Sequence, residues 1–189
     1  MIIEGLLACD DAGLPHISAI GPVVNEELTE WTLRPYQSSR MFSLLRRTGR
    51  VVFHVTDDVL PIVQLMVGDA PSLETTSMGP GLWRIDSACR WFELEIESWN
   101  VESMRSEARA VVRRQGELRP FWGWNRAKHA LLEAAVLISR AGLLDRDVLL
   151  RGLAACASPI EKTAGPREQQ AWELIRRWQQ AYEITETKP

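Results

Sequence analysis

The hydrophobic periodicity of the chain changes once, near residue 120, and this change constrains the fold more than any other feature. Before it, apolar residues form short runs or alternate with polar ones, whereas after Asn125 they recur at helical spacing. Alternation with a period of two is typical of strands with one buried face, and a repeat of three to four residues is typical of amphipathic helices. The sequence therefore predicts a strand-rich domain at residues 1–118 and a helical domain at residues 119–189.

The first part of the chain contains several short strand candidates separated by few helices. Within the longest candidate, Glu93, Glu95 and Glu97 alternate with apolar residues, so these carboxylates are expected to face water. Residues 68–81 are rich in Pro, Ser, Thr and Gly and are expected to form a loop. This pattern favours a small antiparallel barrel over a parallel, doubly wound sheet. The expected strands span residues 2–9, 16–24, 30–34, 51–56, 91–104 and 105–115.

Two short helices are expected inside the strand-rich part. The first begins near Ser39 and stops at Gly49, a residue that commonly ends helices. The second follows Asp57 and Asp58, whose carboxylates can cap its first turn, and ends near Gly68.

Three helices are expected in the second part, at residues 127–140, 145–157 and 166–182. The first of them is apolar on nearly all sides, so the barrel or a second subunit has to cover it. In the last one, Trp172, Ile175 and Trp178 recur every three residues and are expected to mark the buried stripe.

Charge and cysteine content exclude several classes of protein. The net charge of −3 and the pI near 5.7 argue against a nucleic-acid-binding surface, which needs clustered basic residues. The three cysteines are widely spaced and form no C-x-x-C pair, so neither a disulfide framework nor a metal site is expected. The N-terminus lacks the basic segment of a signal peptide, and no apolar run reaches the length of a membrane span. We therefore expect a soluble, cytoplasmic protein without nucleic-acid or membrane partners.

Common catalytic and nucleotide-binding motifs are missing from the sequence. No G-x-G-x-x-G opens a helix after a strand, and G-x-x-x-x-G-K-[ST], G-x-S-x-G and H-E-x-x-H are absent. These absences disfavour a stable NAD(P) domain, a hydrolase of the nucleophile-elbow type and a zinc enzyme.

The segment 34–40 links a strand to a helix and is the first candidate site. Ser38 or Ser39 is expected to cap the helix, whose first N–H groups then point at whatever lies ahead. Arg34 and Arg40 add positive charge to the positive end of the helix dipole, and the combination suits a phosphate. An ordinary serine cap with two solvated arginines explains the same spacing and stays open as the alternative.

The start of the helix after Asn125 is the second candidate site. If Asn125 caps this helix, Arg126 and Lys128 lie in its first turn, where cations oppose the dipole unless an anion or an acidic neighbour is near. His129 follows at once, and Glu133 is placed four residues further on to hold its ring. Surface cations outside the helix start are the alternative.

Tryptophan is unusually abundant, with 8 Trp against 2 Tyr and 4 Phe. The indole ring has a large apolar area and one N–H donor, so it suits cores, interfaces and flat ligands alike. Most of these residues are expected to supply core and interface area. Only Trp122 and Trp124 flank a candidate site.

Two further motifs resemble catalytic groups but have simpler explanations. His54 lies in the middle of a strand, where a histidine is more often a satisfied core residue than a catalyst. Asp57 and Asp58 resemble a paired-carboxylate acid–base site, yet capping of the next helix explains them with fewer assumptions. Catalytic residues therefore stay unassigned.

Four stretches of the sequence, taken in order, resemble one family. They read L-R-P-Y-Q-S-S from residue 33, R-R-T-G-R-V-V-F-H-V-T-D-D from 46, D-S-A-C-R-W-F-E from 86 and W-N-R-A-K-H-A-L-L-E-A-A from 124. The family is domain of unknown function 447 (DUF447), which looks like a branch of the FMN-binding split β-barrel superfamily with its flavin reductases and pyridoxamine-phosphate oxidases. The resemblance runs from Ile2 to about Arg140. It implies an α+β fold, a split antiparallel β-barrel with a C-terminal helical subdomain.

The resemblance also implies a homodimer with FMN at the subunit interface. The first candidate segment would hold the FMN phosphate, and the strand at 51–56 would run beside the flavin ring and the ribityl chain. Lys128 is the first choice for a cation near the flavin N1–C2=O edge, where positive charge stabilises the reduced anionic form. The implied FMN-binding residues are Arg34, Gln37, Ser38, Ser39, Arg40, His54, Val55, Thr56, Asn125, Lys128 and His129.

Two functional hypotheses follow from the resemblance. The first is an oxidoreductase that uses FMN for hydride or electron transfer to a small substrate. The second is a protein that carries FMN without turnover, as a carrier or sensor, or a dimeric interaction module that has lost the cofactor. The fold alone does not separate them.

Overall fold

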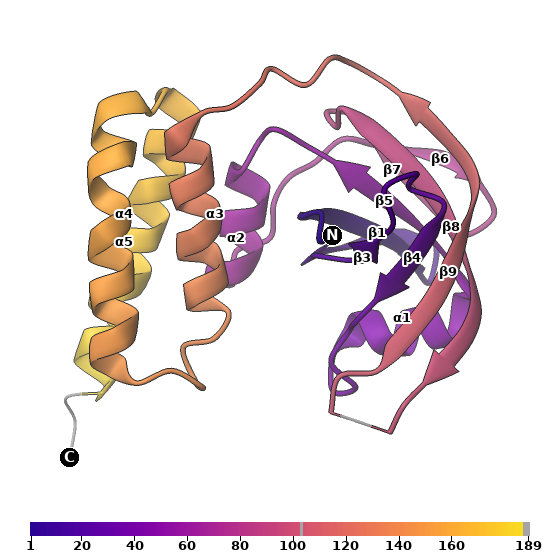
Figure 1. Cartoon of the computed structure of the whole chain (residues 1–189), viewed down its shortest axis with the longest axis horizontal. Coiled ribbons are helices and arrows are strands. Elements are labelled where there is room, and N and C mark those ends of the chain that lie inside the picture. Colours follow the sequence, from indigo (N-terminus) through magenta and orange to yellow (C-terminus); the bar gives the residue numbers. More distant parts are fainter. Residues whose placement is uncertain (103, 187–189) are drawn as a thin grey trace. The chain divides into compact units, whose positions relative to one another are not determined.

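The structure, a computed structural model, describes residues 1–102 and 104–186. Their contacts divide the chain into two compact units: residues 1–56 with 72–121, and residues 57–71 with those from 122 onward. In the described chain, the strands and one helix belong to the first unit and four helices belong to the second (Figure 1). Residues 57–71 thus group with the C-terminal helices, which no local sequence pattern indicated.

The first unit is built from a seven-stranded antiparallel sheet and a separate two-stranded hairpin. The strands are β1 (Gly5–Asp11), β2 (Leu14–Ile20), β3 (Val23–Val24), β4 (Glu30–Leu33), β5 (Arg50–Val55), β6 (Thr75–Gly79), β7 (Leu82–Ile85), β8 (Arg90–Asn100) and β9 (Glu107–Glu117). The large sheet has the order β2-β1-β5-β8-β9-β4-β3. It curls strongly, with the long strands β8 and β9 bending together in Figure 1.

The core of this unit lies between the curled sheet and the helix α1 (Arg40–Thr48). Trp31 is 1% exposed, and its ring centroid lies 5.1 Å from that of Phe53 and 5.0 Å from that of Phe92. The indole N–H donates to the Leu28 carbonyl at 2.9 Å, so the one polar group of this large ring is satisfied. α1 covers the core with three buried side chains, Met41, Leu44 and Leu45.

The ends of α1 agree with the sequence prediction. Ser39 is the N-cap, and its hydroxyl accepts a hydrogen bond from the Phe42 N–H at 3.1 Å. Gly49 is the C-cap with φ 64°, a left-handed conformation that glycine adopts without steric cost. The helix therefore stops sharply, and β5 begins at once.

The sequence predicted one loop at residues 68–81. This prediction is wrong, because the segment contains the strand β6. β6 pairs with β7, and β7 packs against β1 and β5 with Leu82 and Ile85 buried. The exposed side of the hairpin is polar, so β6 shows no hydrophobic alternation, and only its pairing with β7 reveals it as a strand.

Glu93 was expected to face water with its two neighbouring glutamates, but it is 1% exposed. Its carboxylate pairs with Arg50, and it accepts a hydrogen bond from Arg114 Nε at 2.5 Å. Burial raises the pKa of Glu93, and the hydrogen bonds from the two guanidinium groups outweigh burial and lower it. The ladder with β9 shifts register directly after Glu93, so simple alternation fails at this bulge.

The second unit consists of α2 (Leu60–Val67), α3 (Arg126–Ile138), α4 (Arg146–Thr163) and α5 (Pro166–Glu186). α3 packs against the other three helices, and α2 also packs against α5. The buried face of α3 is mostly small, which permits close helix packing; its buried residues are Ala127, Ala130, Leu131, Ala134, Ala135 and Ile138. Within the described residues, no helix has the length and apolarity needed to cross a membrane.

α4 is longer than expected and continues through Pro159 to Thr163. The proline removes one N–H from the helix, which is why the sequence indicated an earlier end. Ile160 is buried, and the Thr163 hydroxyl accepts a hydrogen bond from the Ala127 N–H at 3.0 Å. Tertiary packing of the last turn thus outweighs the local cost of the proline.

The buried stripe of α5 also differs from the expected one. Ala171 and Ile175 are fully buried, whereas Trp172 and Trp178 are only half-buried. The Trp178 ring stacks on Tyr182 at 5.1 Å on the same helix. Ile175 is therefore the one member of the expected stripe that is a core residue.

Candidate functional site

The segment between β4 and α1 is anchored on the start of β9. Ser106 donates from its N–H at 3.2 Å and from its hydroxyl at 3.0 Å to the Pro35 carbonyl. The Gln37 amide donates to the Val101 carbonyl at 2.9 Å. Gln37 and Ser38 are exposed, so the segment presents polar side chains to solvent from a fixed backbone.

The start of α1 has backbone N–H donors, and the first turn of the helix contains no acidic side chain. The Ser39 hydroxyl donates to the Tyr36 carbonyl at 2.7 Å and accepts from the Phe42 N–H, so it satisfies one N–H of the first turn. The first turn contains no acidic residue. Helix starts of this kind favour anions.

Both arginines of the segment are ion-paired, in contrast to the solvated arginines of the alternative interpretation. Arg34 lies 3.0 Å from the Glu107 carboxylate, and Arg40 pairs with Asp11. The two arginine side chains are nevertheless 45% and 66% exposed. The segment is therefore less cationic than the sequence suggests, yet both guanidinium groups stay accessible.

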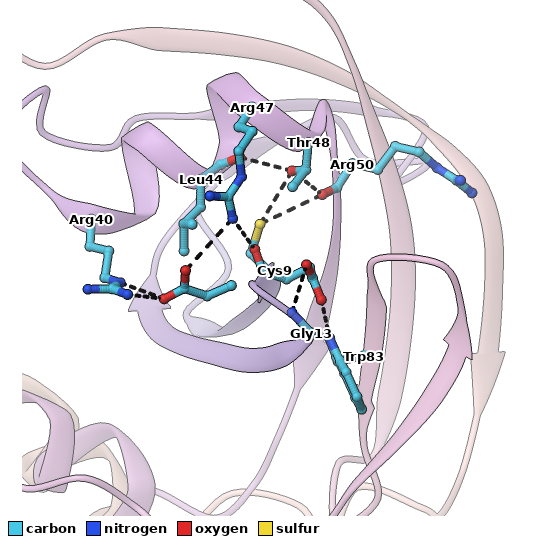
Figure 2. Close-up of polar contacts among 10 residues, drawn as sticks. Cys9, Gly13, Arg40, Leu44, Arg47, Thr48, Arg50 and Trp83 are labelled. Atoms are coloured by element: carbon cyan, nitrogen blue, oxygen red, sulfur yellow. Dashed lines mark hydrogen bonds and ion pairs between the residues drawn. The ribbon is translucent and has the colours of Figure 1, made fainter.

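The end of the β1–β2 hairpin reaches both α1 and β7, as Figure 2 shows. Arg40 Nε donates to Asp11 at 2.7 Å, and Arg47 donates to the Asp10 carbonyl at 3.2 Å. The Asp10 carboxylate accepts a hydrogen bond from the Trp83 indole N–H at 3.1 Å. The hydrogen bond from Arg40 lowers the pKa of Asp11. In the sequence these two aspartates look only like turn residues, and no local signal indicates that they contact the arginines of α1.

His54 is a satisfied core residue. It is fully buried; its Nε2 accepts a hydrogen bond from the Ile85 N–H at 3.0 Å, and its Nδ1 lies 3.3 Å from the Leu6 carbonyl. Because a backbone N–H only donates, Nε2 is unprotonated and the ring proton is on Nδ1. Burial lowers the pKa of His54 to about 4. The ring thus ties β7 to β1 and β5, and its direct contact with FMN stays a prediction.

Val55 and Thr56, at the end of β5 and just beyond it, are half-buried. The Val55 carbonyl accepts a hydrogen bond from the Cys89 N–H at 2.8 Å, next to its pairing with Arg90 of β8. Part of each side chain is accessible, so the strand end retains the surface expected of a ligand-facing position. Their role in binding stays a prediction.

In the second unit, Asn125 caps α3 as predicted. Its side chain accepts from the Lys128 N–H at 3.1 Å and donates to the Thr163 carbonyl at 3.1 Å. The exposed His129 ring lies against the Trp124 ring with 5.0 Å between centroids. The sequence analysis expected Glu133 to hold the His129 ring. The ring contact found among the described residues is instead with Trp124, in the segment before the helix.

The acidic groups near this helix start have structural roles. Asp58 lies just before Val59, the N-cap of α2; its carboxylate accepts from the Leu60 N–H at 3.1 Å and also pairs with Arg167. The Asp57 carboxylate accepts from the Trp122 N–H at 3.1 Å. Asp58 thus binds the first N–H of α2 although Val59 occupies the N-cap position, and the carboxylate of Asp57 anchors the chain before α3.

Lys128 has an acidic neighbour of its own. Its ammonium lies 4.0 Å from the Glu168 carboxylate, which is nearly buried and also accepts from the Gly165 N–H at 2.9 Å. This carboxylate compensates part of the cost of a cation in the first turn of a helix.

The structure gathers the predicted residues into two groups, apart from His54, Val55 and Thr56 at and just beyond the end of β5. Arg34, Gln37, Ser38, Ser39 and Arg40 lie in one loop and helix start of the first unit, and Asn125, Lys128 and His129 lie on one turn of the second unit. The sequence missed Asp11 and Glu107, which pair with the two arginines. Among residues 1–102 and 104–186, no group of three or more His, Cys, Asp or Glu side chains could hold a metal ion.

Several solved structures share this fold. An FMN-bound DUF447 protein from Methanosarcina mazei matches with a TM-score of 0.81 at 21% identity, over 94% of this chain and 94% of that chain. The styrene monooxygenase flavin reductase from Pseudomonas putida S12 matches with a TM-score of 0.52 at 20% identity, over 62% of this chain and 82% of that chain. An FMN-binding protein from Thermus thermophilus with bound 1-cyclohex-2-enone has a TM-score of 0.52 at 9% identity, over 61% and 70%. The fold is thus a split antiparallel β-barrel with C-terminal helices, as expected.

Comparison with protein families identifies the chain more specifically. The sequence model of the DUF447 N-terminal domain matches residues 4–117, and a second DUF447 model matches residues 125–177. No curated protein matches the sequence. The resemblance carried by the four sequence stretches is confirmed. The chain belongs to DUF447, a family of proteins of unknown function.

Proposed function

We propose that this protein binds FMN and acts as an oxidoreductase in the form of a homodimer, with the cofactor at the subunit interface. The observation that carries the proposal is the fold it shares along 94% of both chains with an FMN-bound member of the same family. The flavin reductase and the FMN-binding protein with similar barrels support the same cofactor.

The residues of the first candidate segment fit the phosphate of FMN. The start of α1 supplies N–H groups and no acid, and the exposed side chains of Gln37 and Ser38 add donors. Arg34 and Arg40 each bind a carboxylate through part of the guanidinium group, which has five N–H donors in all. Donors are therefore left on both arginines for a phosphate.

In this proposal the two domains have different tasks. The barrel domain, residues 1–118, holds the phosphate through the 34–40 segment and lines the flavin with the end of β5. The helical domain, residues 119–189, supplies Asn125, Lys128 and His129. FMN, when bound, supplies the hydride or electron transfer chemistry. The Lys128 ammonium would stabilise negative charge on the reduced flavin, and Glu168 holds that ammonium in place.

A carrier of FMN without turnover is the second candidate function. It is favoured by the structural roles of the groups that resemble an acid–base pair. His54 is buried between backbone partners, and the carboxylates of Asp57 and Asp58 accept backbone hydrogen bonds. Neither feature leaves an obvious group to move a proton to a substrate.

Colour and redox assays test the two candidates in sequence. The purified protein should be yellow and should release FMN on denaturation, and protein that is colourless and takes up no added FMN would contradict both. Anaerobic mixing of the yellow protein with NADH, NADPH and a reduced deazaflavin then separates them. Bleaching with one donor supports the oxidoreductase, whereas no bleaching with any of them supports the carrier.

A further inference from the structure

The large sheet has one open edge, along β2. The sheet order places β1 on one side of β2 and no strand on the other. At the opposite end of the sheet, β3 is covered by the N-terminal residues, because Ile2 forms a bridge with Val23. Among residues 1–102 and 104–186, no backbone hydrogen bond joins β2 to a segment other than β1. An open edge of this kind can pair with a strand of another chain.

The turn before β2 shows which backbone groups of the strand face this edge. The turn residues Ala12 and Gly13 have φ of 55° and 88°. They link Asp11 of β1 to its pairing partner Leu14. A two-residue hairpin turn with positive φ at both positions is closed by a hydrogen-bonded pair, after which open and hydrogen-bonded pairs alternate. The residues whose backbone groups face the open edge are therefore Pro15, Ile17 and Ala19.

β2 lacks the charged side chains that commonly protect an open edge. Its sequence, LPHISAI, contains no Lys, Arg, Asp or Glu, and such residues are a usual means of preventing edge pairing. Pro15 is the one blocking residue, because it has no N–H to donate. It lies next to the turn, so the N–H groups of Ile17 and Ala19 still point to the open edge. The edge can therefore accept a partner strand from Ile17 onward.

The backbone of β2 is complementary to a second copy of itself. Ile17 is the midpoint of its seven residues, so two antiparallel copies related by a two-fold axis at Ile17 overlap along the whole strand. Ile17 then exchanges two hydrogen bonds with the partner's Ile17. Each Ala19 N–H meets the carbonyl of the partner's Pro15, which needs no N–H to accept. Every N–H group on the open edge thus gains an acceptor.

The side chains fit the same register. Leu14, which is 70% exposed, lies opposite the partner's Ile20, so two apolar side chains cover each other. His16 lies opposite the partner's Ser18, whose hydroxyl can bond the imidazole. A shift that moves the axis to Ser18 would pair only residues 16–20 of each strand. The register about Ile17 therefore uses more of the strand.

We propose that two copies of the chain pair antiparallel through β2, about a two-fold axis at Ile17, and join their large sheets into one. The contact rests on the homodimer of the proposed function for its partner, and it does not depend on FMN. Because backbone groups carry the contact, it depends on register and on the N–H groups of the open edge.

Disulfide trapping in the full chain tests the register. Ile17→Cys places two Cα atoms about 5.5 Å apart across the axis, a distance that a disulfide spans. Under mild oxidation, most of this variant should become covalent dimer. Ala19→Cys is the matched control on the same edge, because its two Cα atoms lie roughly 14 Å apart in this register. The natural cysteines Cys9, Cys89 and Cys156 are buried and should not link.

Amide hydrogen exchange measures the same contact without a substitution. The Ile17 and Ala19 amides should exchange at least about tenfold more slowly in the dimer than after dilution to the monomer, because their N–H groups bond only across the axis. The His16 and Ser18 amides bond to β1 and should stay protected in both states.

A lysine at the axis tests whether the contact holds the dimer together. Ile17→Lys places two ammonium groups opposite each other and should weaken dimerisation about tenfold, as measured by sedimentation velocity. Ser77→Lys, on the exposed strand β6, is the control and should not change dimerisation.

Three results would overturn the β2 contact. These are no more linking of Ile17→Cys than of Ala19→Cys, equal exchange of the Ile17 amide in monomer and dimer, and a dimer that Ile17→Lys leaves intact. A dimer that binds FMN while its Ile17 amide exchanges freely would contradict only the β2 contact. A covalent Ile17→Cys dimer that takes up no FMN would contradict only the proposed cofactor. Protein that stays monomeric at all concentrations would contradict both the contact and the homodimer.

Discussion

The starts of α1 and α3 look alike in the sequence and differ in the folded protein. Each helix has a polar N-cap, Ser39 or Asn125, and each has a cation directly after it and no acid in its first turn. At α1 the neighbouring strands provide Asp11 and Glu107 for the arginines. At α3, Arg126 has no ion-pair partner among the described residues, and two exposed indoles precede the helix.

This difference shows that the charge and the apolar surface around a helix start depend on the segments that pack against it. The α1 start is polar, partly neutralised and accessible, which suits a phosphate that shares its arginines with carboxylates. The α3 start has two exposed indoles before it, and the Lys128 ammonium in its first turn lies 4.0 Å from Glu168. The same local pattern therefore has different surroundings at the two helix starts, and the following experiments separate the two regions.

The largest expected effect compares how the free energy of unfolding depends on acid pH when buried His54 or exposed His129 is replaced. The pKa of His54 is lowered from 6.5 to about 4 in the folded protein, so the unfolded chain binds more protons between these values. The free energy of unfolding should therefore fall as the pH drops from about 7 to 4, by roughly 3 kcal/mol from this residue.

Urea denaturation at several pH values measures this contribution. Glutamine can accept from the Ile85 N–H and donate to the Leu6 carbonyl without titrating, so His54→Gln should remove that part of the acid sensitivity. His129→Gln at the exposed histidine is the control and should retain it. Equal pH dependence of the wild type and His54→Gln would show that the buried ring is not the acid-sensitive group.

The next largest expected effect is on the affinity for FMN, when an arginine near one or the other helix start is replaced by alanine. Arg34→Ala should weaken FMN binding by about 1–3 kcal/mol, because a charge-assisted hydrogen bond to the phosphate is lost. Arg126→Ala should leave the phosphate contribution intact, as should Arg113→Ala, whose side chain pairs with Glu95. Fluorescence titration with FMN measures the affinities. Unchanged affinity in Arg34→Ala would place the phosphate elsewhere.

Loss of the two caps should have smaller and unequal effects on stability. Ser39→Ala should lower the free energy of unfolding by about 1 kcal/mol, a typical value for a serine cap. Asn125→Ala should cost more, about 1–2 kcal/mol, because Asn125 also donates to the Thr163 carbonyl. Denaturant unfolding of both variants tests the order, and a larger loss in Ser39→Ala would contradict it.

The smallest effect concerns the carboxylate that competes with the phosphate. Asp11→Asn should tighten FMN binding, by less than tenfold, because Arg40 loses its anionic partner and a negative charge leaves the site. The gain should shrink at high salt. Glu95→Gln, at an exposed ion pair outside the candidate residues, should not change the affinity. Weaker FMN binding in Asp11→Asn would show that Asp11 positions Arg40 for the ligand.

Much of the fold could be predicted from local patterns. The ends of α1, the cap at Asn125 and the long antiparallel pair of β8 and β9 all follow from short-range signals. The strand β6 and the end of α4 could not, because pairing with β7 and packing of Ile160 override weak or contrary local preferences. Glu93 was misplaced because a bulge changes the alternation that the prediction assumed.

The candidate site divides in the same way. The residue types of the 34–40 segment and of the α3 start are visible in the sequence, and so is the family. Their charge state and accessibility are not, because Asp11 and Glu107 are far from Arg40 and Arg34 along the chain and meet them only through the sheet.

By itself, the sequence determined the order of the longer strands and helices, the N-caps of α1 and α3 and the family, because periodicity, capping and motif order are local properties. Only the tertiary structure decided that His54 and Glu93 are buried, that α2 packs with the C-terminal helices and that two of the eight indoles stay exposed. Burial and ion pairing depend on which segments far apart in the sequence come into contact, and the local spacing of residues does not predict those contacts.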